Sequence, residues 1–220
     1  MGLFKKHMLS HREENYLKAL DIAQRLLLSS DIKERCRIAG AEWKPSEGGG
    51  TICLRYFDTT CKITIPDFKY SLKESAENIN LFNQILILHY LNGVKDIPFK
   101  NKLISFKEIP SGEFYYPAFV RRSIEPLLKT FSKNLQAFKS IAEGLGGKPV
   151  QIGDAGIKIS VFPCVPVTFA LWFADEEFPP DLQILFDASI TEFLSTEDIA
   201  VLSQEVMIRM IKSYYSSLPI

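Results

Sequence analysis

Apolar residues recur at intervals of three to four positions in several long segments, and this spacing predicts amphipathic helices. The expected helical segments are 11–28, 75–91, 116–131, 134–143 and a final segment that begins just after Ser195. Two pairs of residues have the spacing of a capping box, which marks a helix start: Asp31 with Glu34, and Ser195 with Asp198. We therefore also predict a short helix that follows Asp31 and ends near Gly40.

Shorter segments rich in β-branched and aromatic residues predict strands. Segments 51–57 and 61–65 are expected to form a hairpin, with a turn centred on Asp58 and Thr59 that pairs Tyr56 with Cys61. Further strands are expected at 103–106, 156–162, 165–173 and 182–186. Strands and helices alternate irregularly, with connections too short for βαβ crossovers throughout. This order favours an α+β fold in which antiparallel sheet pieces pack against several helices.

The length of 220 residues suits one large domain. We expect an N-terminal segment over 1–15 that frays, followed by a single compact α+β domain over 16–220. The N-terminal part of this domain is expected to be rich in helices. Its stretch 146–200 is expected to be rich in strands and acidic residues.

The charges balance over the whole chain but not along it. Lys and Arg number 26, and Asp and Glu also number 26. A nonspecific nucleic-acid binder needs a basic surplus to neutralise phosphates, so we expect no nucleic-acid partner. Residues 1–145 carry a positive surplus of 6, whereas 146–200 carry a negative surplus of 7. Either each region has a solvated face of one sign, or an acidic patch around 175–181 meets a basic partner or a cation.

No secretory signal is evident, and the longest apolar runs fall well short of the roughly 18 residues of a membrane-spanning helix. We therefore expect a cytoplasmic protein that does not contact a membrane. The four cysteines include no C-x-x-C pair, so the close ligand spacing of structural zinc or iron–sulfur sites is absent. Four buried thiols are expected in a reducing compartment.

The most unusual stretch is an acidic loop that contains Asp175, Glu176 and Glu177. Three consecutive carboxylates after an apolar strand offer hard oxygen ligands to a divalent cation. One of them could act as a general acid or base if burial raised its pKa. Adjacent loop residues point in different directions, however, and a charge run after a strand is usually solvated. Both interpretations remain open.

Two further sets of residues are candidates for binding. His89 falls on the apolar face of its expected helix, either as a core histidine satisfied by hydrogen bonds or as a group for acid–base chemistry or metal ligation. Tyr116 lies in an aromatic cluster beside Arg121. The cluster consists of Phe114, Tyr115, Tyr116 and Phe119, next to Arg121 and Arg122. It could stack a planar ligand whose carboxylates meet the arginines, or it could simply be a packed helix start with a solvated basic flank.

Several stretches together resemble the domain-of-unknown-function 3786 family of anaerobic bacteria and archaea. They are Ile87 to Leu91, Leu103 to Gly112, Gly146-Gly147, Gly153-Asp154, Phe162-Pro163, Val165-Pro166, Trp172, Asp175 to Pro179, Leu185 to Ser189 and Glu197-Asp198. Some relatives are fused to a four-cysteine iron–sulfur domain also found in corrinoid and carbon-monoxide metabolism. The resemblance implies an accessory role near anaerobic redox, corrinoid or tetrapyrrole chemistry, with an iron–sulfur or corrinoid protein as a partner. It adds Trp172 to the candidate ligand-binding residues.

The chain lacks the motifs of the common catalytic sites, which favours a non-catalytic protein. Our leading hypothesis is a ligand-binding or accessory module with a pocket between the helices and the C-terminal sheet. The expected ligand is a small molecule or a cofactor, with a tetrapyrrole or corrinoid as the family-based choice. One alternative is a small metal-dependent enzyme that uses the acidic loop and His89. Another is a protein-interaction subunit that uses the acidic face.

Overall fold

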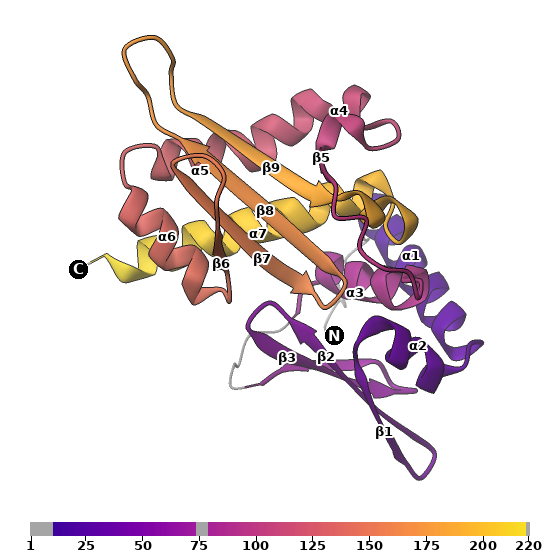
Figure 1. Ribbon diagram of the computed structural model, residues 1–220. Helices are drawn as coiled ribbons and strands as arrows, with labels where there is room; N and C mark the ends of the chain where they lie inside the picture. Colours follow the sequence, from indigo (N-terminus) through magenta and orange to yellow (C-terminus); the bar gives the residue numbers. More distant parts are fainter. Residues whose placement is uncertain (1–10, 74–78, 219–220) are drawn as a thin grey trace, which may run out of the picture.

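Two antiparallel sheets and a surrounding set of helices make up the protein (Figure 1). The computed structural model describes residues 11–73 and 79–218. The chain has the expected α+β fold, with antiparallel pairing in every strand pair that the structure describes. In the described ranges, no helix combines the length and the apolar character needed to cross a membrane.

The N-terminal part contains helices α1 (His11–Leu28) and α2 (Ile32–Ala39) and a four-stranded sheet. The Asp31 carboxylate accepts a hydrogen bond from the Glu34 backbone N–H at the start of α2, as the capping signal predicts. Gly40 ends α2 with a φ of 66°, a left-handed conformation that glycine adopts without steric cost. The sheet consists of β1 (Glu42–Ser46), β2 (Gly49–Tyr56), β3 (Thr59–Ile65) and β4 (Lys69–Leu72), in that order.

The predicted register of the β2–β3 hairpin is wrong. Tyr56 pairs with Thr59 and Leu54 with Cys61, so the turn lies one residue earlier than expected, at Phe57 and Asp58. Phe57 is fully buried and has a φ of 58°. Its backbone N–H donates a hydrogen bond to the Val161 carbonyl at 3.0 Å, in the other sheet. A contact distant in sequence thus fixes the position of this turn.

The second sheet has five strands in the order β5-β9-β8-β7-β6. Their bounds are β5 (Leu103–Ser105), β6 (Lys148–Val150), β7 (Ala155–Phe162), β8 (Val165–Trp172) and β9 (Asp181–Asp187). The three long strands match the strand-rich block expected from the sequence. The central strand β8 is buried along most of its length on both faces, because helices pack around this sheet.

The remaining helices surround the five-stranded sheet and join it to the first sheet. They are α3 (Leu81–Gly93), η1 (Phe106–Glu108), α4 (Gly112–Phe119), η2 (Val120–Ile124), α5 (Glu125–Phe131), α6 (Leu135–Gly144), η3 (Ala188–Glu192) and α7 (Thr196–Ser217). Helix α7 runs behind this sheet in Figure 1 and contacts α3, α5, α6 and η2. Helix α3 begins later than the expected helix over 75–91, because the Asn80 side chain caps it; residues 75–78 of that prediction lie outside the described residues.

Three aromatic rings connect the two sheets through the core. Phe162 of β7 stacks on Tyr90 of α3, with ring centroids 4.4 Å apart, and on Tyr56 of β2, with centroids 5.5 Å apart. The Tyr90 hydroxyl donates a hydrogen bond to the Ala39 carbonyl at 2.8 Å and accepts one from the Cys164 N–H. The rings and this hydroxyl therefore join α2, α3 and both sheets.

We expect Phe162→Ala to lower the free energy of unfolding by about 3–5 kcal/mol, because it removes a fully buried ring that touches both sheets. Urea denaturation followed by tryptophan fluorescence measures the change. Phe178→Ala is the matched control, because this ring is 64% exposed and its loss should change stability by no more than about 0.5 kcal/mol. Equal effects of the two substitutions would contradict a joining role for Phe162.

Candidate functional site

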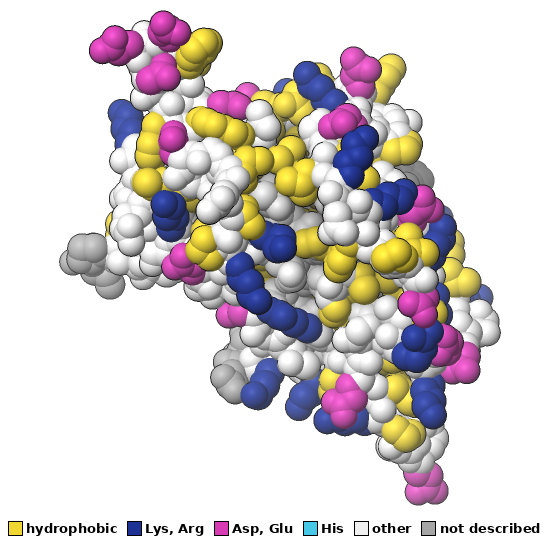
Figure 2. Space-filling model, viewed as in Figure 1, with side chains coloured by type: hydrophobic (Ala, Val, Ile, Leu, Met, Phe, Trp, Pro, Cys, Tyr) yellow, Lys and Arg dark blue, Asp and Glu magenta, His cyan; other side chains and the backbone are white. Residues whose placement is uncertain are grey.

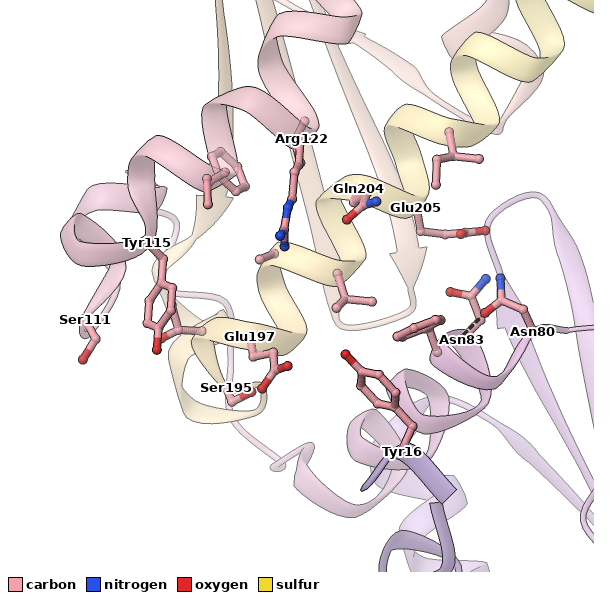
Figure 3. Close-up of a pocket in the computed structure, with 18 residues that line it drawn as sticks. Tyr16, Asn80, Asn83, Ser111, Tyr115, Arg122, Ser195, Glu197, Gln204 and Glu205 are labelled. Atoms are coloured by element: carbon pink, nitrogen blue, oxygen red, sulfur yellow. Dashed lines mark hydrogen bonds between the residues drawn. The ribbon is translucent and has the colours of Figure 1, made fainter. Parts of the chain in front are cut away.

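A pocket of about 760 Å³ lies among the helices, beside the N-terminal half of α7 (Figure 3). Its walls come from α7, from α4 and η2, and from residues of α3 and α1. No strand of the described chain contributes to its lining, so this pocket lies between helices and not between helices and the C-terminal sheet as expected. The volume falls within the roughly 300–1,000 Å³ of small-molecule sites.

One face of α7 forms the longest wall of this pocket. Its lining residues recur every three to four positions, as one helix face requires. They are Thr196, Glu197, Ala200, Val201, Gln204, Glu205 and Ile208. The wall is about 18 Å long, given the 1.5 Å rise per residue of an α-helix. Small residues in its middle leave room, and polar residues near its ends offer hydrogen bonds.

The opposite wall contains a wide π-helical turn. Helix α4 passes without interruption through the π-helical residues Val120–Ile124 into α5. Single π turns inside α-helices often occur at functional sites. Here the turn contributes Arg122 and Ser123 to the pocket lining, next to Tyr115 and Phe119 from α4.

Ser123 has a buried hydroxyl without a partner. The residue is 1% exposed, and its Oγ forms no hydrogen bond within the described chain. Leaving a buried polar group unpaired costs about 1–3 kcal/mol, and native proteins pair nearly all of them. Ser123 belongs to the pocket lining, but its Oγ is closed off from solvent, so a molecule in the pocket reaches this hydroxyl only if the side chain turns about χ1.

Charged groups of both signs line the same cavity. The Arg122 guanidinium forms no hydrogen bond or ion pair with the described residues, and it points toward the cavity in Figure 3. Glu197 lies on α7 across the cavity from it. The buried Glu205 carboxylate accepts a hydrogen bond from Arg209 Nε at 2.7 Å. The guanidinium of Arg209 lies over the rings of Tyr56 and Phe57, which fixes this pair at the edge of the pocket.

Hydrogen bonds hold the start of α7 in place at one end of the pocket. The Ser195 hydroxyl accepts from the Asp198 N–H, while the Asp198 carboxylate accepts from the Ser195 N–H, so the predicted capping box is present. The Thr196 hydroxyl donates to the Pro110 carbonyl at 2.6 Å. The other oxygen of Asp198 lies 2.7 Å from His89 Nδ1 of α3. Three separate segments therefore position this end of the wall.

His89 supports this wall and does not line the pocket. Its hydrogen bond to Asp198 raises the pKa of the imidazole, against the lowering effect of burial. Burial raises the pKa of the Asp198 carboxyl, but hydrogen bonds from His89 and Ser195 together hold it below its ordinary value. The His89 side chain is 37% exposed and bonds Asp198 through Nδ1, so the histidine lies at the edge of the core, and both roles considered for it stay open.

The other predicted site residues do not come together. Tyr116 stacks on Phe119, with centroids 6.3 Å apart, and Lys107 Nζ lies 4.3 Å from its ring centroid. Arg121 is exposed and does not line the pocket. Trp172 is half-buried at the end of β8, where it pairs with Asp181.

Asp175, Glu176 and Glu177 are exposed at the tip of the β8–β9 hairpin, the long loop at the upper left of Figures 1 and 2. The Asp175 carboxylate accepts hydrogen bonds from the N–H groups of Phe178 and Glu177, which lowers its pKa. No group of three or more His, Cys, Asp or Glu side chains in the described ranges is arranged to hold a metal ion.

Part of the pocket lining was visible in the sequence. Tyr115, Phe119 and Arg122 belong to the aromatic–arginine cluster singled out above, and all three line the cavity. Ser123 was missed because no local pattern shows that a serine loses its partner on folding. Glu205 could have been found from the sequence, because it lies beside Val206 on the apolar side of the last helix. A carboxylate buried there needs a partner.

We expect Ser123→Ala to raise the free energy of unfolding by about 1 kcal/mol, because it removes an unpaired buried hydroxyl. Ser203→Ala on α7 is the matched control: Ser203 is fully buried, but its Oγ donates to the Ile199 carbonyl at 2.8 Å. This second variant should leave stability unchanged or lower it. Chemical denaturation of both variants checks the difference in sign, and a clear loss of stability in Ser123→Ala would show that its hydroxyl has a partner.

The His89–Asp198 pair makes stability depend on pH. Folding raises the pKa of His89. Its contribution to the free energy of unfolding is therefore complete below the ordinary pKa of 6.5 and is lost as pH rises through the raised pKa. Folding lowers the pKa of Asp198, so its contribution to the free energy of unfolding is complete above the ordinary pKa of 3.8 and is lost as pH falls through the lowered pKa. The free energy of unfolding of the wild type, minus that of His89→Asn, should therefore be larger at about pH 5.5 than at about pH 9. A difference that is constant between these pH values would contradict this linkage.

Comparison with known proteins places the chain in a family. A family model described as "Domain of unknown function (DUF3786)" matches residues 31–209. No curated protein and no solved structure matches the chain. The matched range begins at the cap of α2 and ends within α7, so it contains both sheets and all pocket residues except Tyr16. Because this match covers most of the sequence, the chain belongs to the DUF3786 family.

Proposed function

We propose that the protein is a ligand-binding module and that its ligand occupies the pocket between α7 and the α4–η2 helix. The observation that carries this proposal is a cavity large enough for a small molecule whose lining includes the Arg122 guanidinium. Folding leaves this guanidinium without a partner among the described residues, and an anionic ligand can supply one.

The lining favours a small organic molecule with an anionic group. Arg122 presents a planar guanidinium without a protein partner in the described chain, and this group binds carboxylates and phosphates through two parallel hydrogen bonds. Phe119 and Val201 offer apolar surface for the body of the ligand. The side-chain amides of Asn83 and Gln204 can fix its orientation.

The pocket lining does not favour the tetrapyrrole or corrinoid that the family resemblance suggested. Such cofactors are commonly held through their metal by a His, Cys, Met or Tyr side chain. No His, Cys or Met lines the pocket in the described part of the chain, and its tyrosines are Tyr16 and Tyr115. Charged and amide side chains are prominent in this lining, which suits a smaller polar ligand better than a macrocycle. We therefore propose a metal-free ligand for this site.

The two alternative functions have less support. The acidic loop lies at an exposed hairpin tip, where Asp175 is engaged by its own backbone and no histidine of the described chain is nearby to complete a metal site. The exposed Phe178 beside these carboxylates suits contact with a basic protein, but the neighbouring structure does not specify such a partner.

Ligand-observed NMR with a library of small carboxylates, phosphates, amines and amides tests the proposal. We expect some fragments with an anionic group to bind, and Arg122→Gln to weaken them by about tenfold or more, as the loss of a charged hydrogen bond implies. Arg121→Gln is the matched control, because this neighbouring arginine is exposed outside the pocket and its loss removes the same charge.

Binding that survives in Arg121→Gln and is weakened in Arg122→Gln supports the pocket as the binding site. The proposal fails if no fragment binds, or if the two variants weaken binding equally. Equal weakening would indicate a general electrostatic effect on the surface and not a specific contact in the pocket.

A further inference from the structure

Two opposite charges line the same cavity without neutralising each other. Arg122 extends from η2 into the cavity, and Glu197 extends toward it from the first turn of α7 (Figure 3). No ion pair joins them, although other arginines of the described chain pair with nearby carboxylates. The open space of the cavity separates these two groups.

The helices that carry these two charges are held in place by their surroundings. Glu197 lies between Thr196, whose hydroxyl is bonded to Pro110, and Asp198, which is bonded to His89. The start of α7 therefore has little freedom to move toward η2. On the other side, Arg122 belongs to a helix that continues on both sides of the π turn. Both groups are thus attached to rigid elements that face each other across the pocket, the placement that a binding site needs.

We propose that the ligand of this pocket is zwitterionic, with a carboxylate at Arg122 and an ammonium group at Glu197, as in an α-amino acid or a short peptide. This inference rests on the proposed binding function of the same pocket. An ammonium group donates hydrogen bonds to a carboxylate, and a carboxylate accepts two from a guanidinium. A ligand with both groups pairs with both of these exposed side chains, whereas a ligand with one charged group pairs with only one of them.

The remaining space suits an apolar or aromatic side chain. Phe82, Phe119 and Val201 provide apolar surface in the cavity. We therefore choose L-phenylalanine as the probe, since its ring can pack against the aromatic part of this lining.

Isothermal titration calorimetry with three related molecules tests the inference. L-Phenylalanine carries both charges, 3-phenylpropanoate lacks the ammonium group, and 2-phenylethylamine lacks the carboxylate. We expect L-phenylalanine to bind at least tenfold more tightly than either analogue. Arg122→Gln should remove the preference for L-phenylalanine over the amine, and Glu197→Gln should remove its preference over the carboxylate. Glu113→Gln is the control, because Glu113 is exposed on α4 and does not line the pocket.

Loss of each preference in only the matching variant supports the zwitterion, because each variant removes one charge partner. The inference is overturned if either analogue binds as tightly as L-phenylalanine, or if L-phenylalanine does not bind. In both cases the proposed binding function still stands if library fragments bind in a manner that depends on Arg122. It fails separately if no fragment of the library binds at all.

Discussion

The stacking of Tyr56, Phe162 and Tyr90 is the interaction on which the arrangement of this protein depends. Each sheet buries one face in a common core, and these rings are where β2, β7 and α3 meet. The Tyr90 hydroxyl makes this contact geometrically specific, because it hydrogen-bonds to Ala39 and Cys164, which belong to different segments. A purely apolar contact would permit sliding, whereas a buried hydroxyl with two partners favours one relative position.

The pocket differs from this core in its charged groups. Buried hydroxyls without a partner among the described residues occur in both places, at Tyr56 in the core and at Ser123 in the pocket wall. Arg122 and Glu197, in contrast, lie in one cavity without pairing within the described chain. The helix start that carries Glu197 is at the same time held by bonds from Ser195, His89 and Pro110. Rigid walls with unmatched polar groups are typical of binding sites, where stability is given up for recognition.

Local sequence signals predicted the elements whose causes are local. Asp31 and Ser195 mark helix starts that the structure contains, and the β-branched and aromatic content of 156–162, 165–173 and 182–186 predicted the long strands correctly. The strands β1, β4 and β6 were missed, because all three lie at sheet edges and are largely exposed. Strands β1 and β6 also contain a proline, Pro45 and Pro149, which weakens a strand signal. The hairpin turn was misplaced by one residue because a hydrogen bond to Val161 fixes it. Contacts between distant segments also limit what could be predicted of the site. The residues of the aromatic–arginine cluster were visible in the sequence. That Arg122 and Glu197 line one cavity depends on how two helices distant in sequence pack.

The π turn at Val120–Ile124 also changes the phase of the helix that contains it. One extra residue in a helical turn rotates everything beyond it by about 100° relative to an uninterrupted α-helix. The α4 part packs against η1, and the α5 part packs against α7, α6 and β9. The continuous α4–η2–α5 helix can thus present one face to the cavity and a differently oriented face to the core. Deleting one residue at this turn would bring the two halves into one continuous phase, so that both could no longer meet their present neighbours.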